Sequence, residues 1–336
     1  MIYYRTTYCY NLLSRRQTAA EQFVPIQGNI GSMKLFFVFS GQGAQSVGMG
    51  RDLCEKYSTA RQYFDTADQV LGYSLSDVIF NGPVEKLTQT RYCQSAIYTM
   101  SCACLGVFRE KFPALEPAAA AGLSLGEYAA LCCGGAFTFE EGLKLLQKRA
   151  DLMDECCNST SGGMATALGC EAAVIEEVCA AAGVDVANYN SPGQIVISGD
   201  KEKVKEAVAE LKGRGYRKVI ELQVAGAFHS KLMAPAGAGL AEVLKGTELK
   251  LPVIPVYQNF TAAAPASVDE LKANLAAQVS GSVRWESGVR AAAAAGAEMM
   301  IEFGPGNVLT GLLKRTIPEM KSANINSAES LESFQI

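Results

Sequence analysis

Histidine and tryptophan are nearly absent from this chain of 336 residues, which contains one of each. A protein zinc site draws on histidine and on closely spaced cysteine ligands, and none of the eleven cysteines forms a C-x-x-C pair. We therefore expect no metal site, and we expect free, mostly buried thiols in a reducing cytosol. A reaction that needs an imidazole base has a single residue to use.

Long apolar runs and an excess of basic charge are also missing. No run approaches the roughly 18 residues that a membrane helix needs, so we expect a soluble protein of the cytoplasm with no membrane partner. The net charge of −4 differs from the clustered positive charge of a general nucleic-acid binder, so we expect no nucleic-acid partner. The apolar share of 49% and the charged share of 19% are ordinary for a globular chain.

Residues 1–32 differ from the rest because they show no regular hydrophobic period and no apolar segment like that of a secretory signal. They end at Gly31-Ser32, before a second methionine, Met33. We expect an extension outside the fold, either of cloning origin or disordered, and a transit peptide is the alternative.

From Leu35 onward, short apolar runs alternate with helical patterns, which predicts an α/β fold with a parallel sheet. We expect strands at 35–39, 118–122, 253–257 and 299–303. We expect helices at 51–70, 94–112, 139–155, 268–279 and 286–296.

The pattern changes between residues 158 and 227. Strands expected at 164–168, 184–190, 194–198 and 217–224 enclose helices at 171–182 and 201–213. This βαββαβ order predicts a ferredoxin-like unit inserted into the larger domain. We therefore divide the chain as follows: extension 1–32, catalytic domain 33–157 and 228–325, inserted subdomain 158–227, and tail 326–336.

The segment Gly122-Leu-Ser-Leu-Gly126 fits G-x-S-x-G, with a predicted strand before it and a predicted helix after it. This context is typical of a nucleophile elbow, in which flanking glycines permit a sharp turn that presents the serine. The start of the next helix would favour negative charge that develops in the reaction. We predict Ser124 to be a nucleophile; a chance Gly-Ser turn is the alternative.

A serine nucleophile needs a base, and His229 is the only histidine. A lone histidine is more often structural, but a Ser–His mechanism in this chain has no other candidate. The group that orients the imidazole stays open at this point, because either a carboxylate or a backbone carbonyl would serve.

A glycine-rich loop, Ser40-Gly-Gln-Gly-Ala-Gln45, follows the first strand. The dinucleotide pattern G-x-G-x-x-G fails because Ser46 takes the third glycine position. Backbone N–H donation to an oxyanion is one use for this loop, and an ordinary turn is the other. Arg149 lies near the end of helix 139–155, where position alone indicates a solvated side chain.

Six motifs resemble those of one family when they are taken in order. They are Phe39-Ser-Gly-Gln-Gly-Ala-Gln45, Gly122-Leu-Ser-Leu-Gly-Glu-Tyr128, Asn190-Ser-Pro-Gly-Gln194, Gly226-Ala-Phe-His-Ser230, Val283-Arg-Trp285 and Glu302-Phe-Gly-Pro-Gly306. From Met33 to about Asn324 the chain resembles the malonyl-CoA:acyl carrier protein transacylases of bacterial type II fatty-acid synthesis. The resemblance implies an α/β-hydrolase-like parallel-sheet domain with an inserted ferredoxin-like subdomain.

The resemblance also implies catalytic roles. Ser124 would carry the acyl group, and His229 would be its base. The backbone carbonyl of Gln278, seven residues before Trp285, would orient the imidazole. The backbone N–H groups of Gln42 and Leu125 would form the oxyanion hole.

Substrate-binding roles follow from the same resemblance. Arg149 would bind the malonyl carboxylate through two parallel hydrogen bonds. Phe228 would fit a pocket that prefers malonyl to methylmalonyl. Gln94, Met153 and Asn190 would line that pocket. Leu123 departs from the family, which usually has histidine just before the nucleophile, and this puts the fine positioning of the serine in doubt.

The implied reaction is ping-pong transfer from malonyl-CoA, through a malonyl-serine, to the phosphopantetheine thiol of acyl carrier protein. We expect a monomer with no bound cofactor, whose partners are acyl carrier protein and malonyl-CoA or coenzyme A. Rival hypotheses are a serine esterase or thioesterase, a non-catalytic carrier-binding module, and a polyketide-pathway acyltransferase. The basic segment 212–218 is either a docking patch for the acidic carrier or, as we favour, a solvated loop.

Overall fold

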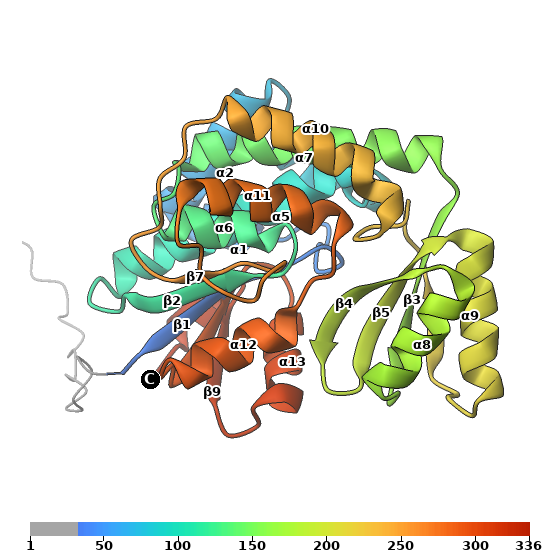
Figure 1. Ribbon diagram of the computed structural model, residues 1–336. Helices are drawn as coiled ribbons and strands as arrows, with labels where there is room; N and C mark the ends of the chain where they lie inside the picture. The colour runs from blue at the N-terminus through green and yellow to red at the C-terminus, as the bar shows by residue number, and fades with distance from the viewer. Residues whose placement is uncertain (1–32) are drawn as a thin grey trace, which may run out of the picture. The chain divides into compact units, whose positions relative to one another are not determined.

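The computed structural model describes residues 33–336, so the extension expected at 1–32 lies outside the described residues. Two sheets organise the described part (Figure 1). One has five strands in the order β7-β2-β1-β8-β9, and the other has four in the order β4-β5-β3-β6. The predicted α/β class with a parallel sheet is confirmed, and a separate antiparallel sheet accompanies it.

All strand pairs in the five-stranded sheet are parallel. Its strands are β1 (Leu35–Phe39), β2 (Pro117–Gly122), β7 (Val256–Tyr257), β8 (Met299–Phe303) and β9 (Lys321–Ile325). Every residue of the central β1 is buried, as expected for a strand covered on both faces. Phe36 packs among residues of α12 and α13, whereas Phe37 packs edge-on against Phe108 of α5.

Helices cover both faces of this sheet, with α5 and α6 on one side and α12 and α13 on the other (Figure 1). Their bounds, with those of the other helices outside the antiparallel unit, are α1 Arg51–Lys56, α2 Ser58–Leu71, α3 Leu75–Asn81, α4 Val84–Leu87, α5 Thr90–Lys111, α6 Gly126–Cys133, α7 Phe139–Ser159, α10 Ala234–Lys245, α11 Val268–Ser280, α12 Trp285–Ala294, α13 Val308–Thr316 and α14 Ala328–Glu332. A capping box between Thr138 and Glu141 fixes the start of α7 where the sequence predicts it.

Three expectations about these elements were wrong. The helix predicted over 51–70 is interrupted at Tyr57, whose backbone is extended, so two helices form. The strand predicted over 253–257 keeps only Val256–Tyr257, since Pro255 lacks an N–H for a ladder. Residues 326–336 are not a tail, because α14 has its own capping box at Ser327 and buries Leu331 completely.

The antiparallel unit comprises β3 (Gly162–Leu168), α8 (Ala172–Ala182), β4 (Asp185–Ser191), β5 (Gln194–Asp200), α9 (Lys201–Gly213) and β6 (Val219–Leu222). Helices α8 and α9 lie on one face of its sheet, shown at the right of Figure 1. An apolar core fills the space between them, with Ile175, Ile197 and Leu211 fully buried. The connection into this unit is short, because α7 runs to Ser159 and β3 begins at Gly162.

Within residues 33–336, no helix combines the length and the hydropathy that a bilayer crossing requires. The cysteines of this part of the chain carry free thiols, and most of them are buried. Burial raises the pKa of the Cys104 thiol to about 12, which keeps it protonated and unreactive at neutral pH.

Candidate active site

Ser124 lies in the turn between β2 and α6 with a φ of 53°, a left-handed conformation that few non-glycine residues adopt. A Cβ on Gly122 would lie 2.0 Å from the main chain of Gly126. A Cβ on Gly126 would lie 2.3 Å from the carbonyl oxygen of Phe39, at the end of β1. Main chains approach one another so closely at this turn that neither position has room for a Cβ, so both must be glycine.

Asn259 holds this turn in place from the segment that follows β7. Its Oδ1 accepts from the Ser124 N–H at 2.6 Å, and its Nδ2 donates to the Gly122 carbonyl at 2.7 Å. The Asn259 side chain is 2% exposed, so these bonds are shielded from water. Sequence reasoning missed this residue, although its place after a parallel strand was a usable signal, because such strand ends meet at one edge of the sheet.

His229 reaches the serine from the loop after β6. Its Nε2 lies 2.8 Å from Ser124 Oγ, and its Nδ1 lies 2.8 Å from the carbonyl oxygen of Gln278 in α11. A carbonyl can only accept, so Nδ1 carries the hydrogen and Nε2 presents its lone pair to the hydroxyl. His229 also has a positive φ of 58°, so both members of the pair occupy unusual backbone conformations.

Burial and, to a smaller extent, the positive charge of Arg149 together lower the pKa of His229 to about 4, against the opposing effect of the hydrogen bond to Gln278. The imidazole is therefore neutral at pH 7, which is the form that can accept a proton from Ser124.

Arg149 points into the site from α7 and is only 1% exposed. Its Nη1 donates to Gln94 Oε1 at 2.7 Å, and its Nη2 donates to Gln278 Oε1 at 3.0 Å and to Ser124 Oγ at 3.1 Å. Its guanidinium also lies 5.8 Å from the centre of the Tyr128 ring. A buried guanidinium whose partners are neutral can pair with an anionic group of a ligand.

The solvated position expected for Arg149 from its place in the helix is wrong. Leu145, Leu146 and Met153 lie three or four residues away on the same face of α7, and all are buried. This spacing was present in the sequence and was the signal that could have revealed a buried arginine. Met153 also contacts the site, since its Sδ lies 3.6 Å from Gln94 Nε2.

Two backbone N–H groups near the turn at Ser124 have no partner among residues 33–336. No hydrogen bond to another described residue uses the N–H of Gln42 or of Leu125. Their segments are close, because a Cβ on Gly41 would lie 2.8 Å from the carbonyl oxygen of Leu123. The side chain of Leu123 is partly buried and packs against the apolar cluster between the sheet and α12.

Phe228 and Asn190 are less closely tied to the serine. Phe228 is buried next to His229 in the chain, and Asn190 is 8% exposed on β4 with its Oδ1 unpartnered within the described structure. The structure gives neither side chain a hydrogen bond to Ser124, His229 or Arg149.

A buried carboxylate, Glu127, lies one turn of α6 beyond the serine and was also missed from the sequence. It accepts hydrogen bonds from Gln258, Asn259 and Gln278. The site therefore holds a buried carboxyl group as well as a buried guanidinium, and Gln278 contacts both.

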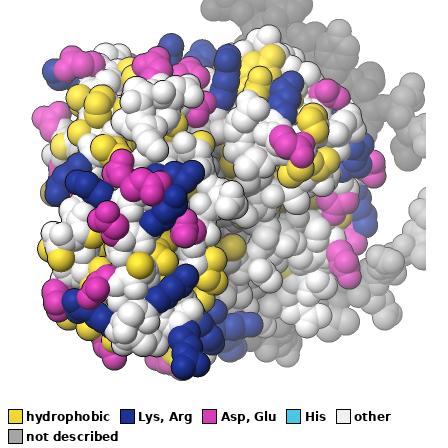
Figure 2. All heavy atoms as spheres, turned by 90° about the vertical axis from the view of Figure 1, so that its right-hand side faces the viewer, with side chains coloured by type: hydrophobic (Ala, Val, Ile, Leu, Met, Phe, Trp, Pro, Cys, Tyr) yellow, Lys and Arg dark blue, Asp and Glu magenta, His cyan; other side chains and the backbone are white. Residues whose placement is uncertain are grey.

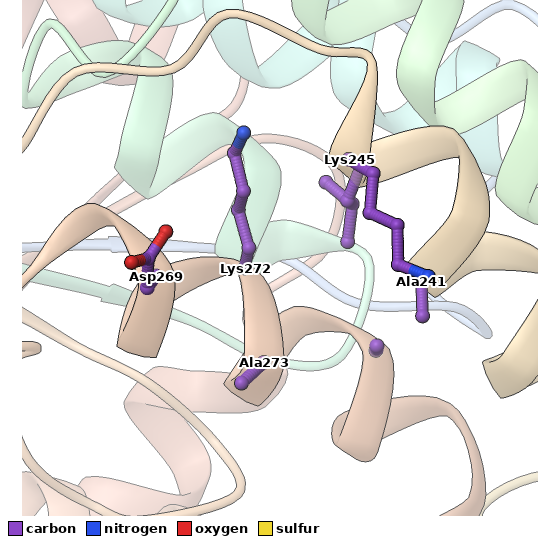
Figure 3. A pocket seen from close by; sticks show the side chains of 7 residues that line it. Ala241, Lys245, Asp269, Lys272 and Ala273 are labelled. Carbon is purple, nitrogen blue, oxygen red and sulfur yellow. The ribbon is translucent and has the colours of Figure 1, made fainter.

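Two surface hollows lie elsewhere. The first, of about 360 Å³, lies between α10 and α11, with Lys245, Asp269 and Lys272 around it (Figure 3). The second, of about 520 Å³, is lined by residues of α2, α7 and α10 and of the segment after α10. Neither is lined by Ser124, His229 or Arg149, so these two hollows do not mark the chemistry.

Comparison with known proteins gives a consistent result. The family model described as "Acyl transferase domain" matches residues 36–335. The malonyl CoA-acyl carrier protein transacylase of Bacillus subtilis is 38% identical over 304 residues, which cover 89% of this chain and 95% of that protein.

Solved structures agree with the sequence comparison. An acyl carrier protein S-malonyltransferase from Vibrio cholerae is 38% identical, with a TM-score of 0.86, covering 90% of this chain and 100% of that one. A malonyl-transacylase solved in complex with its type II PKS acyl-carrier protein is 36% identical, with a TM-score of 0.87, covering 89% of this chain and 98% of that one. The chain therefore belongs to the malonyl-CoA:acyl carrier protein transacylase family of acyl transferases.

Proposed function

We infer that this chain transfers a malonyl group from malonyl-CoA to the phosphopantetheine thiol of acyl carrier protein and so supplies fatty-acid synthesis. The observation that carries this proposal is the placement of Ser124 Oγ within hydrogen-bond distance of both His229 Nε2, at 2.8 Å, and the buried Arg149, at 3.1 Å. A nucleophile with a base fits acyl transfer, and a buried cation beside it fits an acyl group that carries a carboxylate.

In the first half-reaction, Ser124 Oγ attacks the thioester carbonyl carbon of malonyl-CoA while His229 Nε2 takes the hydroxyl proton. Negative charge on the carbonyl oxygen would be met by the free N–H groups of Gln42 and Leu125, each worth a few kcal/mol in comparable sites. The C–S bond then breaks, coenzyme A leaves with the proton from His229, and a malonyl ester of Ser124 remains.

The second half-reaction reverses these steps with a different thiol. The phosphopantetheine thiol gives its proton to His229 and attacks the ester carbonyl carbon. The C–O bond to Ser124 breaks, and His229 returns the proton to Ser124 Oγ. The Gln278 carbonyl stabilises the imidazolium that forms in each half-reaction, because it accepts from Nδ1 at 2.8 Å.

Specificity for malonyl would come from Arg149. Its Nη2 hydrogens, now shared between Ser124 and Gln278, would turn to the free carboxylate of the acyl group. Gln94 would keep the other arm of the guanidinium in place, through its bond to Nη1 at 2.7 Å. An acetyl group lacks the carboxylate and would bind poorly.

The remaining predicted pocket residues, Met153, Phe228 and Asn190, would shape the cavity for the acyl group and the pantetheine arm. The bond between Met153 and Gln94 supports the first of these, and the burial of Phe228 beside His229 supports the second. The unpartnered Oδ1 of Asn190 supports a hydrogen bond to a ligand amide.

Hydrolysis and polyketide synthesis are two of the three rival roles, and the third, a non-catalytic carrier-binding module, is disfavoured by the hydrogen bond between Ser124 and His229. A serine esterase would share Ser124 and His229 with water as acceptor, but the relatives named above are transferases. The complex of a related malonyl-transacylase with a type II PKS carrier supports a second pathway for the same transfer chemistry. We propose fatty-acid synthesis first, because the curated relative from Bacillus subtilis bears the general transacylase name.

We further propose an α/β-hydrolase-like catalytic domain, 33–157 with 228–325, that extends through α14, and a ferredoxin-like subdomain at 158–227. The sheet order β4-β5-β3-β6 with two helices on one face supports the second description. The protein would act as a cytoplasmic monomer without a bound cofactor.

The basic segment 212–218 gains little support as a docking patch for the acidic carrier. Arg214 is already paired with Glu177 and Glu210. Figure 2, which faces the side with α8 and α9, shows Lys and Arg side chains interspersed with Asp and Glu side chains. Both observations favour a solvated surface of mixed charge.

Intact mass after brief mixing with malonyl-CoA tests the proposal. We expect one malonyl group on the parent protein and none on Ser124→Ala, while acetyl-CoA should label the parent far more slowly. A parent protein that gains no mass, or a Ser124→Ala variant that gains the same mass, would show that the assignment of the nucleophile is wrong.

A further inference from the structure

Glu127 is completely buried, and each of its hydrogen-bond partners is a donor. Its Oε1 accepts from Gln258 Nε2 at 3.0 Å, and its Oε2 accepts from the Asn259 N–H at 2.7 Å and from Gln278 Nε2 at 2.9 Å. Hydrogen bonds that a carboxyl group accepts stabilise its ionised form. Burial raises the pKa of Glu127 above the ordinary glutamate value, and these three bonds and the charge of Arg149 offset that rise only in part.

Glu127 reaches the nucleophile through Asn259. The carboxylate fixes the main chain of Asn259, whose side chain in turn accepts from the Ser124 N–H at 2.6 Å and donates to Gly122 at 2.7 Å. The buried Glu127 carboxyl group thus stabilises the strained turn at Ser124 indirectly, through Asn259.

Glu127 reaches the substrate-binding cation through Gln278. Both hydrogens of the Gln278 amide are used, one by Glu127 Oε2 at 2.9 Å and one by the Ser124 carbonyl at 3.1 Å. The amide oxygen is therefore turned toward Arg149 Nη2, at 3.0 Å. Without a carboxylate at 127, the amide could turn over and present hydrogens to the guanidinium, which would displace Arg149.

We propose that Glu127 is a positioning residue for substrate selection, which holds the Gln278 amide in the one orientation that aims Arg149 at the acyl carboxylate. This proposal rests on the proposed function of Arg149 and adds the residue that positions Arg149 through Gln278. Two other roles would leave different traces. A role in packing alone would slow all substrates equally, and a role as counter-ion of Arg149 would weaken malonyl binding in the parent.

Glu127→Gln tests the proposal. Glutamine keeps the shape of the glutamate side chain but has an NH2 group, a donor, in place of one of the two acceptor oxygens. The rate of serine acylation would be measured as kcat/KM for malonyl-CoA and for acetyl-CoA. We expect the malonyl-to-acetyl ratio to fall by about tenfold, the value of one hydrogen bond to a charged group. An unchanged ratio with both rates lowered would leave only a packing role, and a raised ratio would show a counter-ion; either result would overturn the proposal.

Glu302→Gln is the matched control. Glu302 is also a fully buried glutamate that accepts from main-chain N–H groups, those of Leu309 at 3.0 Å and Thr310 at 2.8 Å. These partners start α13 and do not contact Arg149 or Gln278. We expect Glu302→Gln to lower thermal stability and to leave the malonyl-to-acetyl ratio of the parent.

Gln278→Met provides a second variant in case Glu127→Gln does not fold. It keeps the main-chain carbonyl that His229 uses and removes the side-chain amide, which joins Glu127 to Arg149 and also donates to the Ser124 carbonyl. We expect the same tenfold loss of preference, and no further loss in the double variant, as for residues that act in series. If Gln278→Met kept the full preference for malonyl-CoA over acetyl-CoA, the proposed link from Glu127 through Gln278 to Arg149 would be refuted. A parent protein that is not labelled faster by malonyl-CoA than by acetyl-CoA would instead refute the role of Arg149 itself.

Discussion

The edge of the parallel sheet around Ser124 differs from the antiparallel unit in backbone strain and in buried charge. At the edge, the chain buries Arg149, Glu127 and His229 and places two non-glycine residues at positive φ. Between residues 162 and 222, positive φ occurs only at glycines, and the core of the unit is apolar. Strain and buried charge are costly, so they persist where many partners fix them, and they indicate where the chemistry lies.

The difference also separates two ways in which substitutions act. Around Ser124, removing a side chain leaves a buried partner without its bond, so activity and specificity change. In the antiparallel unit, apart from Asn190, we expect that removing a side chain changes packing or surface charge, so stability changes while specificity stays. The following predictions compare the two regions.

The largest effect is expected at His229. His229→Ala removes the only imidazole, and we expect the rate of Ser124 acylation to fall roughly 10⁴-fold, the upper range for a general base. Rapid-quench mass spectrometry with malonyl-CoA measures this rate. A fall of less than tenfold would mean that another group takes the proton. The strained, buried residues around Ser124 would then no longer be shown to mark the chemistry.

Paired glycine substitutions compare the regions by stability. Gly126→Ala places a Cβ 2.3 Å from the Phe39 carbonyl, and we expect the free energy of unfolding to fall by about 3 kcal/mol. Gly213→Ala, in the last turn of α9, meets nothing within 4 Å and should raise it by up to about 1 kcal/mol. Urea unfolding checks both, and a mild effect at Gly126 would contradict the close approach of the two main chains.

Paired arginine substitutions compare the regions by specificity. Arg149→Met should lower the malonyl-to-acetyl ratio of kcat/KM about a hundredfold, because two charge-assisted hydrogen bonds to the acyl carboxylate are lost. Arg214→Met, which removes a surface arginine paired with Glu177 and Glu210, should leave the ratio unchanged. A ratio that survives Arg149→Met would remove the carboxylate clamp from the account.

The smallest effect concerns pH. The pKa of His229 is lowered to about 4 in the folded protein, so the unfolded chain binds the extra proton between about pH 4 and pH 6.5. Stability must therefore fall as the pH is lowered through this window, by about 2 kcal/mol between pH 7.5 and pH 5. His229→Gln should lack this component, and equal pH dependence of unfolding in both proteins would contradict the buried neutral imidazole.

Local sequence patterns predicted much of the fold. Helix α9 and strand β8 match their predicted bounds, 201–213 and 299–303, because periodicity and capping residues there agree with burial. The break at Tyr57 has no glycine or proline to announce it, and α10 begins in an Ala-, Gly- and Pro-rich segment with little helical pattern. Tertiary packing decided both.

The candidate site divides in the same way. Ser124 and His229 could be predicted because a motif and the lack of any other histidine single them out. The position of Asn259 after a parallel strand indicated at most the edge of the sheet where it lies. The contacts of Asn259 and Glu127 could not be predicted, because they join Ser124 to Asn259 over 135 residues and Glu127 to Gln278 over 151 residues. Local spacing does not reveal such contacts, and only the folded sheet brings these residues together.

The discharge of the malonyl-serine ester tests the central claim most directly. The acylated protein would be isolated free of malonyl-CoA, and the loss of the malonyl group would be followed by intact mass in buffer alone and with holo-acyl carrier protein. We predict an ester that is stable in buffer for the duration of the assay. The carrier should remove the malonyl group on the time scale of one catalytic turnover and should itself gain that group. Equal rates of loss with and without the carrier, with free malonate as the product, would contradict transfer and establish a hydrolase.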